Sequence, residues 1–114
     1  MGADLYLIQK NKKADYRNNS KENYYRDSYN DWNLLWKFGL DYWVWFKKLL
    51  NKDGILTPQK AQEVLDTLFA KEDIFNKNIE SLPKDDQTYF EAKYVELRTF
   101  LSKAVSSDGV DCSI

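Results

Sequence analysis

The sequence of 114 residues contains no histidine, a single cysteine and only two prolines. Without an imidazole, the chain cannot build a Ser-His-Asp or Cys-His nucleophile, and the commonest zinc sites are excluded as well. Cys112 has no partner for an internal disulfide, which favours a reducing compartment, so we predict a cytoplasmic protein. The first residues lack the basic and apolar regions of a secretory signal. We expect no metal site and no cofactor.

Charge is balanced overall but unevenly distributed along the chain. Residues 1–60 hold 11 basic and 7 acidic side chains, whereas residues 61–114 hold 6 basic and 11 acidic ones. A chain with a net charge of −1 does not as a whole attract nucleic acid or an anionic membrane. The basic stretch 10–26 also carries scattered carboxylates, so nucleic acid is not the expected partner. No apolar run is long enough to span a bilayer, and we expect no membrane association.

Apolar periodicity predicts a mainly α protein, a compact helical domain of about four helices with one or two short terminal strands. We expect one domain, residues 1–114, composed of a short strand (1–8), a polar, tyrosine-rich connecting segment (9–31), a helical core (32–105) and a tail (106–114). The tail can pair with the first strand, because the ends of small domains often lie close together. Within the connecting segment, tyrosines suggest a helical turn at about 20–26.

Four stretches carry the helical pattern. Tryptophan and leucine spacing predicts a helix over 32–39, and a stretch that is apolar nearly all round predicts a second, central helix over 41–50. Thr57 and Pro58 then open the most regular pattern, which continues to about residue 79. The last helix is expected from about 85 to 105.

Aromatic residues are concentrated in one part of the chain. All four tryptophans lie between Trp32 and Trp45, and ten of the 18 aromatic residues lie between Tyr24 and Phe46. Their helical spacing favours packing in the core. Tryptophan and tyrosine are also the residues that dominate protein interfaces, so a partner-binding face remains an alternative. Trp45 lies off the main apolar stripe and is therefore a candidate contact residue.

A polar and aromatic cluster, residues 24–31, precedes the tryptophans, and this is where we expect a specific site. Arg26 offers a two-pronged donor to a carboxylate or phosphate, and its neighbours add hydroxyl, amide and carboxylate groups. The structural alternative is that Arg26 pairs with Asp27 or Asp31, while Asn30 or Asp31 caps the next helix. We predict no catalytic residue. The candidate binding residues are Tyr25, Arg26, Asp27, Ser28, Tyr29, Asn30, Trp32 and Trp45.

Three segments carry a resemblance to known sequences. They are Met1-Gly2-Ala3-Asp4-Leu5-Tyr6, then Tyr24-Tyr25-Arg26-Asp27-Ser28-Tyr29-Asn30-Asp31 with Leu34-Leu35-Trp36 and Gly39-Leu40, and finally Asp111-Cys112-Ser113. With these segments, most of the chain resembles a family of small uncharacterised bacterial proteins. Members of that family usually have a longer polar insert after the first strand and Ser-Trp-Trp where this chain has Asp41-Tyr42-Trp43. The resemblance implies no activity and no functional residue.

The sequence favours a non-catalytic protein–protein interaction module whose partner is a protein. No constellation of residues required for catalysis is visible, so an enzyme is disfavoured. One alternative is a stoichiometric inhibitor of the kind carried by phages and mobile elements, which acts through a surface. Another is a small-ligand or carbohydrate-binding protein, with or without hydrolytic activity, that uses the cluster from Arg26 to Asp31.

Overall fold

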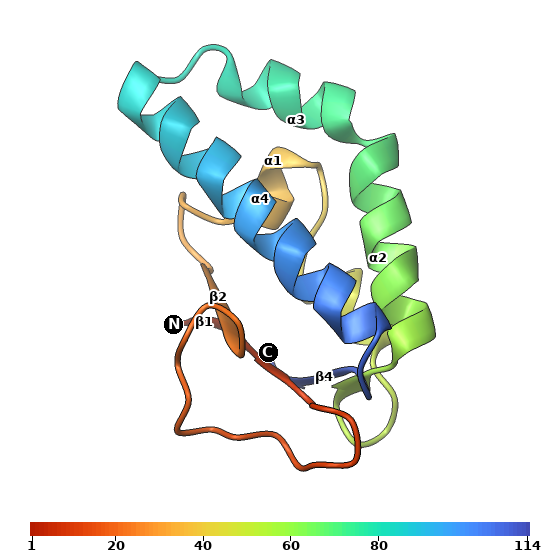
Figure 1. The fold of residues 1–114 in the computed structure, drawn as a ribbon. Coiled ribbons are helices and arrows are strands. Elements are labelled where there is room, and N and C mark those ends of the chain that lie inside the picture. The colour runs from red at the N-terminus through yellow and green to blue at the C-terminus, as the bar shows by residue number, and fades with distance from the viewer.

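A computed structural model describes all 114 residues and shows a four-stranded antiparallel sheet with helices on one face (Figure 1). The elements are β1 (Gly2–Leu7), β2 (Tyr24–Ser28), α1 (Leu34–Lys37), the 3₁₀ turn η1 (Phe46–Leu49), β3 (Ile55–Leu56), α2 (Pro58–Ala70), α3 (Glu72–Ile79), α4 (Lys84–Val105) and β4 (Val110–Ser113). The strand order is β2-β1-β4-β3, and every neighbouring pair is antiparallel. In Figure 1 the helices lie above the sheet, and the segment between β1 and β2 passes below it.

The prediction of a mainly α fold with one or two terminal strands is wrong, because the chain forms a mixed α/β fold. Strands β2 and β3 are not among the strands predicted from the sequence. Strand β2 lacks the alternating apolar pattern of a half-buried strand, because one of its two inward-facing residues is Asp27 instead of an apolar residue. Strand β3 is only two residues long and therefore shows no alternation. The expected pairing of the tail with the first strand is confirmed, since β4 pairs with β1.

Strand β1 shows the alternation that identifies a half-buried strand. Ala3, Leu5 and Leu7 are buried towards the helices, whereas Asp4 and Tyr6 lie on the outer face of the sheet. The long segment between β1 and β2 is attached to this outer face through Tyr16. Its ring packs edge-on against Tyr6 with 5.1 Å between ring centroids, and its hydroxyl donates to the carboxylate of Asp111 on β4.

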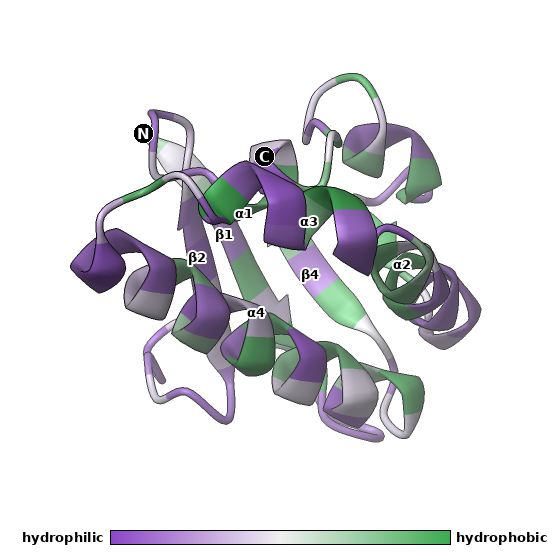
Figure 2. Ribbon diagram, turned by 90° about the horizontal axis from the view of Figure 1, so that it is seen from above, coloured by the Kyte–Doolittle hydropathy of each residue, from purple (hydrophilic) through white to green (hydrophobic).

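The periodic second half of the chain forms the predicted helices. The pattern from 57 to 79 folds as α2 and α3, and the last helix, expected over 85–105, is α4. Thr57 caps α2 by accepting the Lys60 N–H at 3.3 Å, and Pro58 occupies the first helical position. Viewed from above, these helices show apolar stretches interrupted at intervals by hydrophilic ones (Figure 2).

The segment from Trp32 to Leu50 departs most from the prediction of two full helices. Only the four residues of α1 and the single turn η1 are helical there. Helix α1 begins after Asn33, whose side chain accepts the Trp36 N–H at 3.2 Å, so Asn33 is the cap rather than Asn30 or Asp31. It ends before Gly39, which has a φ of 72°, a left-handed conformation that glycine adopts most readily. Local caps and this glycine divide the segment into short turns.

The core lies between the inner face of the sheet and the helices. Its largest fully buried side chains are Tyr25, Tyr42, Phe38, Phe46, Phe90 and Phe100. No tryptophan belongs to this buried set. None of the helices combines the length and apolar composition required to cross a membrane.

Candidate functional site

Strand β2 distributes the predicted binding residues over two faces of the sheet. Successive side chains of a strand point in opposite directions, so Tyr25 and Asp27 enter the core while Arg26 lies on the outer face. Among the other candidates, Ser28, Tyr29 and Trp45 are half-buried, and Asn30 and Trp32 are exposed. The eight residues therefore do not line one site, although several of them have well-defined structural roles.

On the outer face, Arg26 is bound to a carboxylate of the neighbouring strand. Its Nη1 lies 2.6 Å from Oδ1 of Asp4, the residue directly opposite in β1. Asp4 also accepts the Tyr24 hydroxyl. Hydrogen bonding to Asp4 raises the pKa of Arg26. Arg26 thus pairs with Asp4 rather than with Asp27 or Asp31, and the pair links β1 to β2.

On the inner face, Asp27 is a fully buried carboxylate that joins the sheet to α1. Its two oxygens lie 3.0 and 3.1 Å from the Leu34 nitrogen, whose N–H is the first of α1, and one of them accepts the Tyr42 hydroxyl at 2.8 Å. Burial raises the pKa of Asp27, although the hydrogen bonds from Leu34 and Tyr42 act in the opposite direction. Asp27 therefore holds the start of α1 against the sheet.

Three of the four tryptophans lie at the surface instead of in the core, and the fourth, Trp45, is half-buried against the core. Trp32, Trp36 and Trp43 are 41%, 46% and 51% exposed, whereas tyrosines and phenylalanines from the same part of the chain are buried. Large aromatic side chains are on average highly buried, so three tryptophans with half their surface in water are unusual. The helical spacing that favours a tryptophan core is misleading because the segment is not continuously helical.

Asp41 connects two of these tryptophans. Its Oδ2 accepts the Trp36 indole N–H at 3.0 Å, and its Oδ1 accepts the backbone N–H groups of Trp43 and Val44 at 2.7 and 2.9 Å. The hydrogen bond from Trp36 is the main reason that the pKa of Asp41 is lowered. Lys47 places its ammonium 4.3 Å from the Trp43 ring centroid. We call Trp36, Trp43, exposed Val44 and the Asp41 carboxylate that joins them the tryptophan surface.

Trp32 belongs to a separate aromatic stack on α4. Its ring is stacked on Tyr89 and Phe90, with centroid distances of 5.1 and 5.8 Å. The Lys37 ammonium lies 5.0 Å from the Phe90 centroid. This stack holds the residues before α1 against α4 and leaves one side of Trp32 in contact with solvent.

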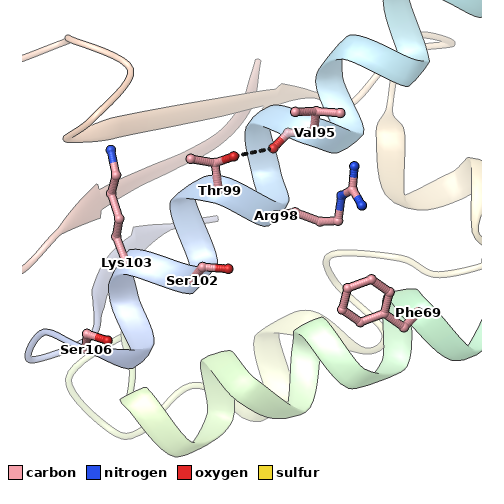
Figure 3. Close-up of a pocket in the computed structure, with 7 residues that line it drawn as sticks. All are labelled: Phe69, Val95, Arg98, Thr99, Ser102, Lys103 and Ser106. Atoms are coloured by element: carbon pink, nitrogen blue, oxygen red, sulfur yellow. Dashed lines mark hydrogen bonds between the residues drawn. The ribbon is translucent and has the colours of Figure 1, made fainter.

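A further group of residues lines an open groove of about 590 Å³ between α2 and α4 (Figure 3). Phe69 comes from α2, Arg98 and Ser102 come from α4, and Ser106 directly follows α4 as its C-cap. None of them is among the binding residues predicted from the sequence. The sequence nevertheless contains a signal, because a spacing of four places Arg98 and Ser102 on the same face of α4, and Ser106 follows at the same spacing where the helix ends.

The groups that metal binding or thiol chemistry requires are not assembled. No three cysteine, aspartate or glutamate side chains are grouped so that they could hold a metal ion. Cys112 is half-buried in β4, and burial raises the pKa of its thiol to about 12. The thiol is therefore protonated at neutral pH, and a protonated thiol is a poor nucleophile.

Similar proteins provide no template for these sites. Comparison with protein families, with curated proteins and with solved structures finds no significant match.

Proposed function

We propose that the protein is a non-catalytic protein–protein interaction module and that its protein partner binds the tryptophan surface. The observation that carries the proposal is the exposure of Trp36 and Trp43, about half of each side chain, next to a core that is filled by phenylalanines and tyrosines of the same part of the chain. Tryptophan is the residue most enriched among those that dominate binding energy at interfaces. A surface with two of them offers a partner a large apolar contact.

The tryptophan surface is held in place before any partner binds. Asp41 fixes the Trp36 indole and the backbone at Trp43 with three hydrogen bonds. Behind it, Asp27 ties the start of α1 to the sheet. A surface that is ordered in advance loses less conformational entropy on association, so more of the contact energy appears as affinity.

The surroundings of the tryptophan surface match the anatomy of an interface. Apolar side chains of Trp43 and Val44 lie beside the charged groups of Asp41 and Lys47. Interfaces commonly combine an apolar centre with a polar rim, and the rim gives orientation more than affinity. The stoichiometric inhibitor is a special case of this proposal, since an inhibitor of that kind also acts by forming a tight complex.

The ligand-binding alternative has less support. It requires Arg26, Tyr29 and Trp32 to converge on one pocket. Arg26 instead binds Asp4 on the outer face of the sheet, whereas Trp32 is stacked on α4. A cytoplasmic location and kinship with small bacterial proteins remain predictions from the sequence.

The test identifies a protein that the wild-type chain binds and then measures the affinity of two double variants for that protein. The wild-type chain is immobilised, proteins retained from host lysate are quantified by mass spectrometry, and the retained partner is purified for affinity measurement. We expect the Trp36→Ala, Trp43→Ala variant to lose affinity by at least about tenfold. The control, Phe69→Ala with Val95→Ala, removes two equally exposed apolar side chains from the α2–α4 groove and should bind normally.

Circular dichroism must first show that both variants are folded. Equal affinity of the tryptophan variant and the wild type would overturn the proposal, as would an equal loss in both variants. Native mass spectrometry of the purified complex adds a second criterion, because an inhibitor should form a complex of fixed stoichiometry.

A further inference from the structure

Arg98 is a cation without a counter-charge. Its guanidinium carbon lies 4.4 Å from the Tyr94 ring centroid, so the planar group rests on the ring. Its Nε is buried and has no hydrogen-bond partner, and no carboxylate lies within ion-pair distance of it. Buried donors in proteins nearly always have partners. Arg98, which carries this unpaired donor, is one of the residues that line the groove between α2 and α4.

The groove around Arg98 is suited to an anion. Figure 3 shows Arg98 leaving α4 on the side of Phe69, with its guanidinium turned upwards along α4, while Lys103 leaves α4 on the other side. Two cations and three hydroxyl-bearing residues line the groove, but no carboxylate does. This is unexpected on charge alone, because residues 61–114 carry 11 acidic side chains and only 6 basic ones. The nearby Glu72 carboxylate accepts a hydrogen bond from the Tyr94 hydroxyl at 2.5 Å and forms no ion pair with Arg98.

Apolar surface lies next to this charge. Phe69 and Val95 are each about half exposed where they line the groove. The hollow of about 590 Å³ is in the range of small-molecule sites, which typically combine apolar walls with a few placed polar groups. The charge and the apolar surface therefore call for a ligand that has both an anionic group and an apolar body.

We propose that the α2–α4 groove binds a small organic anion, a molecule with one carboxylate or phosphate group attached to a flat apolar part. Arg98 donates to the anionic group through its free N–H bonds, since a guanidinium fork matches the oxygens of both acids. Ser102, one turn further along α4, offers a hydroxyl to the same group. The apolar part packs on Phe69 and Val95. This site is independent of the tryptophan surface.

The test is a titration of the ¹⁵N-labelled protein followed by NMR. Phenyl phosphate and phenylacetate supply the two acid groups on the same ring, benzyl alcohol supplies the ring without charge, and inorganic phosphate supplies charge without a ring. We expect saturable shifts at the Arg98 Nε–H and at the amides of Phe69 and Ser102. At least one aromatic acid should bind about tenfold more tightly than benzyl alcohol, and the tighter acid identifies the natural anionic group.

Variants then separate the charge from the apolar wall. Arg98→Gln should weaken binding of the aromatic acid by at least about tenfold. Arg98→Lys keeps the positive charge but loses the paired N–H donors of the guanidinium, so its affinity should lie between those of the wild type and Arg98→Gln. Lys60→Gln, which removes a cation of α2 that is paired with Glu63, is the matched control and should bind as the wild type does. Phe69→Ala should weaken the aromatic acids and leave inorganic phosphate unchanged.

Two results would overturn the proposal. One is a set of chemical shift changes that grow linearly with the concentration of the aromatic acid and do not saturate, because such changes indicate unspecific attraction to a charged surface. The other is equal affinity of the aromatic acid for the wild type and Arg98→Gln. If Arg98→Gln proves unfolded in its NMR spectrum, the Phe69→Ala comparison decides, since equal affinity there would also exclude the groove.

Discussion

Two aspartates stabilise the segment from Trp32 to Leu50, which we call the tryptophan segment. Asp27 does so from the core and Asp41 from the surface. Asp27 accepts a backbone N–H at the start of α1 and the Tyr42 hydroxyl, while Asp41 accepts backbone N–H groups at the next turn and the Trp36 indole N–H. The bonding is alike, yet the pKa of Asp27 is raised and that of Asp41 is lowered. Burial outweighs the hydrogen bonds at Asp27, whereas the hydrogen bonds outweigh slight burial at Asp41.

The two aspartates therefore have different structural roles. The buried carboxylate connects elements that are distant in the sequence, so the position of α1 depends on it. The exposed carboxylate acts within a few residues and arranges side chains that face solvent. We therefore expect substitution of Asp27 to affect the whole fold and substitution of Asp41 to affect mainly the tryptophan surface.

The largest expected effect follows from Asp27→Ala. The change leaves the Leu34 N–H and the Tyr42 hydroxyl buried without their acceptor. We expect the free energy of unfolding to fall by about 2–4 kcal/mol, measured by urea denaturation. Asp27→Asn keeps one acceptor oxygen and should lose less. A loss below about 1 kcal/mol for Asp27→Ala would show that the core can relax around the missing carboxylate.

A smaller effect is expected from Asp41→Ala. The turn at Trp43 loses its side-chain cap and the Trp36 indole loses its acceptor, so the free energy of unfolding should fall by about 0.5–2 kcal/mol. The Trp36 indole N–H resonance should move towards the position of a solvent-exposed indole. Asp31→Ala, an exposed aspartate of the same segment, is the control. Equal effects of the two substitutions would contradict the role assigned to Asp41.

The smallest effect is a difference in pH dependence between the two aspartates. The raised pKa of Asp27 means that its contribution to stability is complete below its unfolded pKa, about 3.9, and is lost as pH rises through the folded pKa. The lowered pKa of Asp41 means that its contribution is present above the unfolded pKa and is lost as pH falls through the folded pKa.

Urea denaturation between pH 3 and pH 7 tests this difference. The stability advantage of the wild type over Asp27→Asn should grow as pH falls, and its advantage over Asp41→Asn should shrink. Trends of the same sign in the two comparisons would refute the assignment of burial as the deciding factor at Asp27.

The helices α2 to α4 could be predicted because the information that specifies them is local. Apolar residues recur along each helix at the helical period, and Thr57 with Pro58 marks where α2 begins. The β4 pairing was also accessible, since a short tail beside a first strand suggests an added strand. These elements depend little on residues far away in the sequence.

The tryptophan segment could not be predicted in the same way. Its aromatic spacing matches a helix, but α1 starts where Asp27 of a distant strand accepts the Leu34 N–H. The left-handed Gly39 then ends it. Recognising β2 as a strand would have corrected the candidate site too, because alternation alone separates Arg26 from Asp27.

The placement of β1 in the sheet has a consequence for folding kinetics. Strand β1 is synthesised first, yet it lies between β2 and β4, and β4 is also the only strand that pairs with β3. The sheet therefore cannot grow beyond the β1–β2 hairpin until residues 110–113 are available. Such non-local pairing carries a loop-closure cost that local helix formation does not. We expect α2 to α4 to form early when the denatured chain refolds and the sheet to close last.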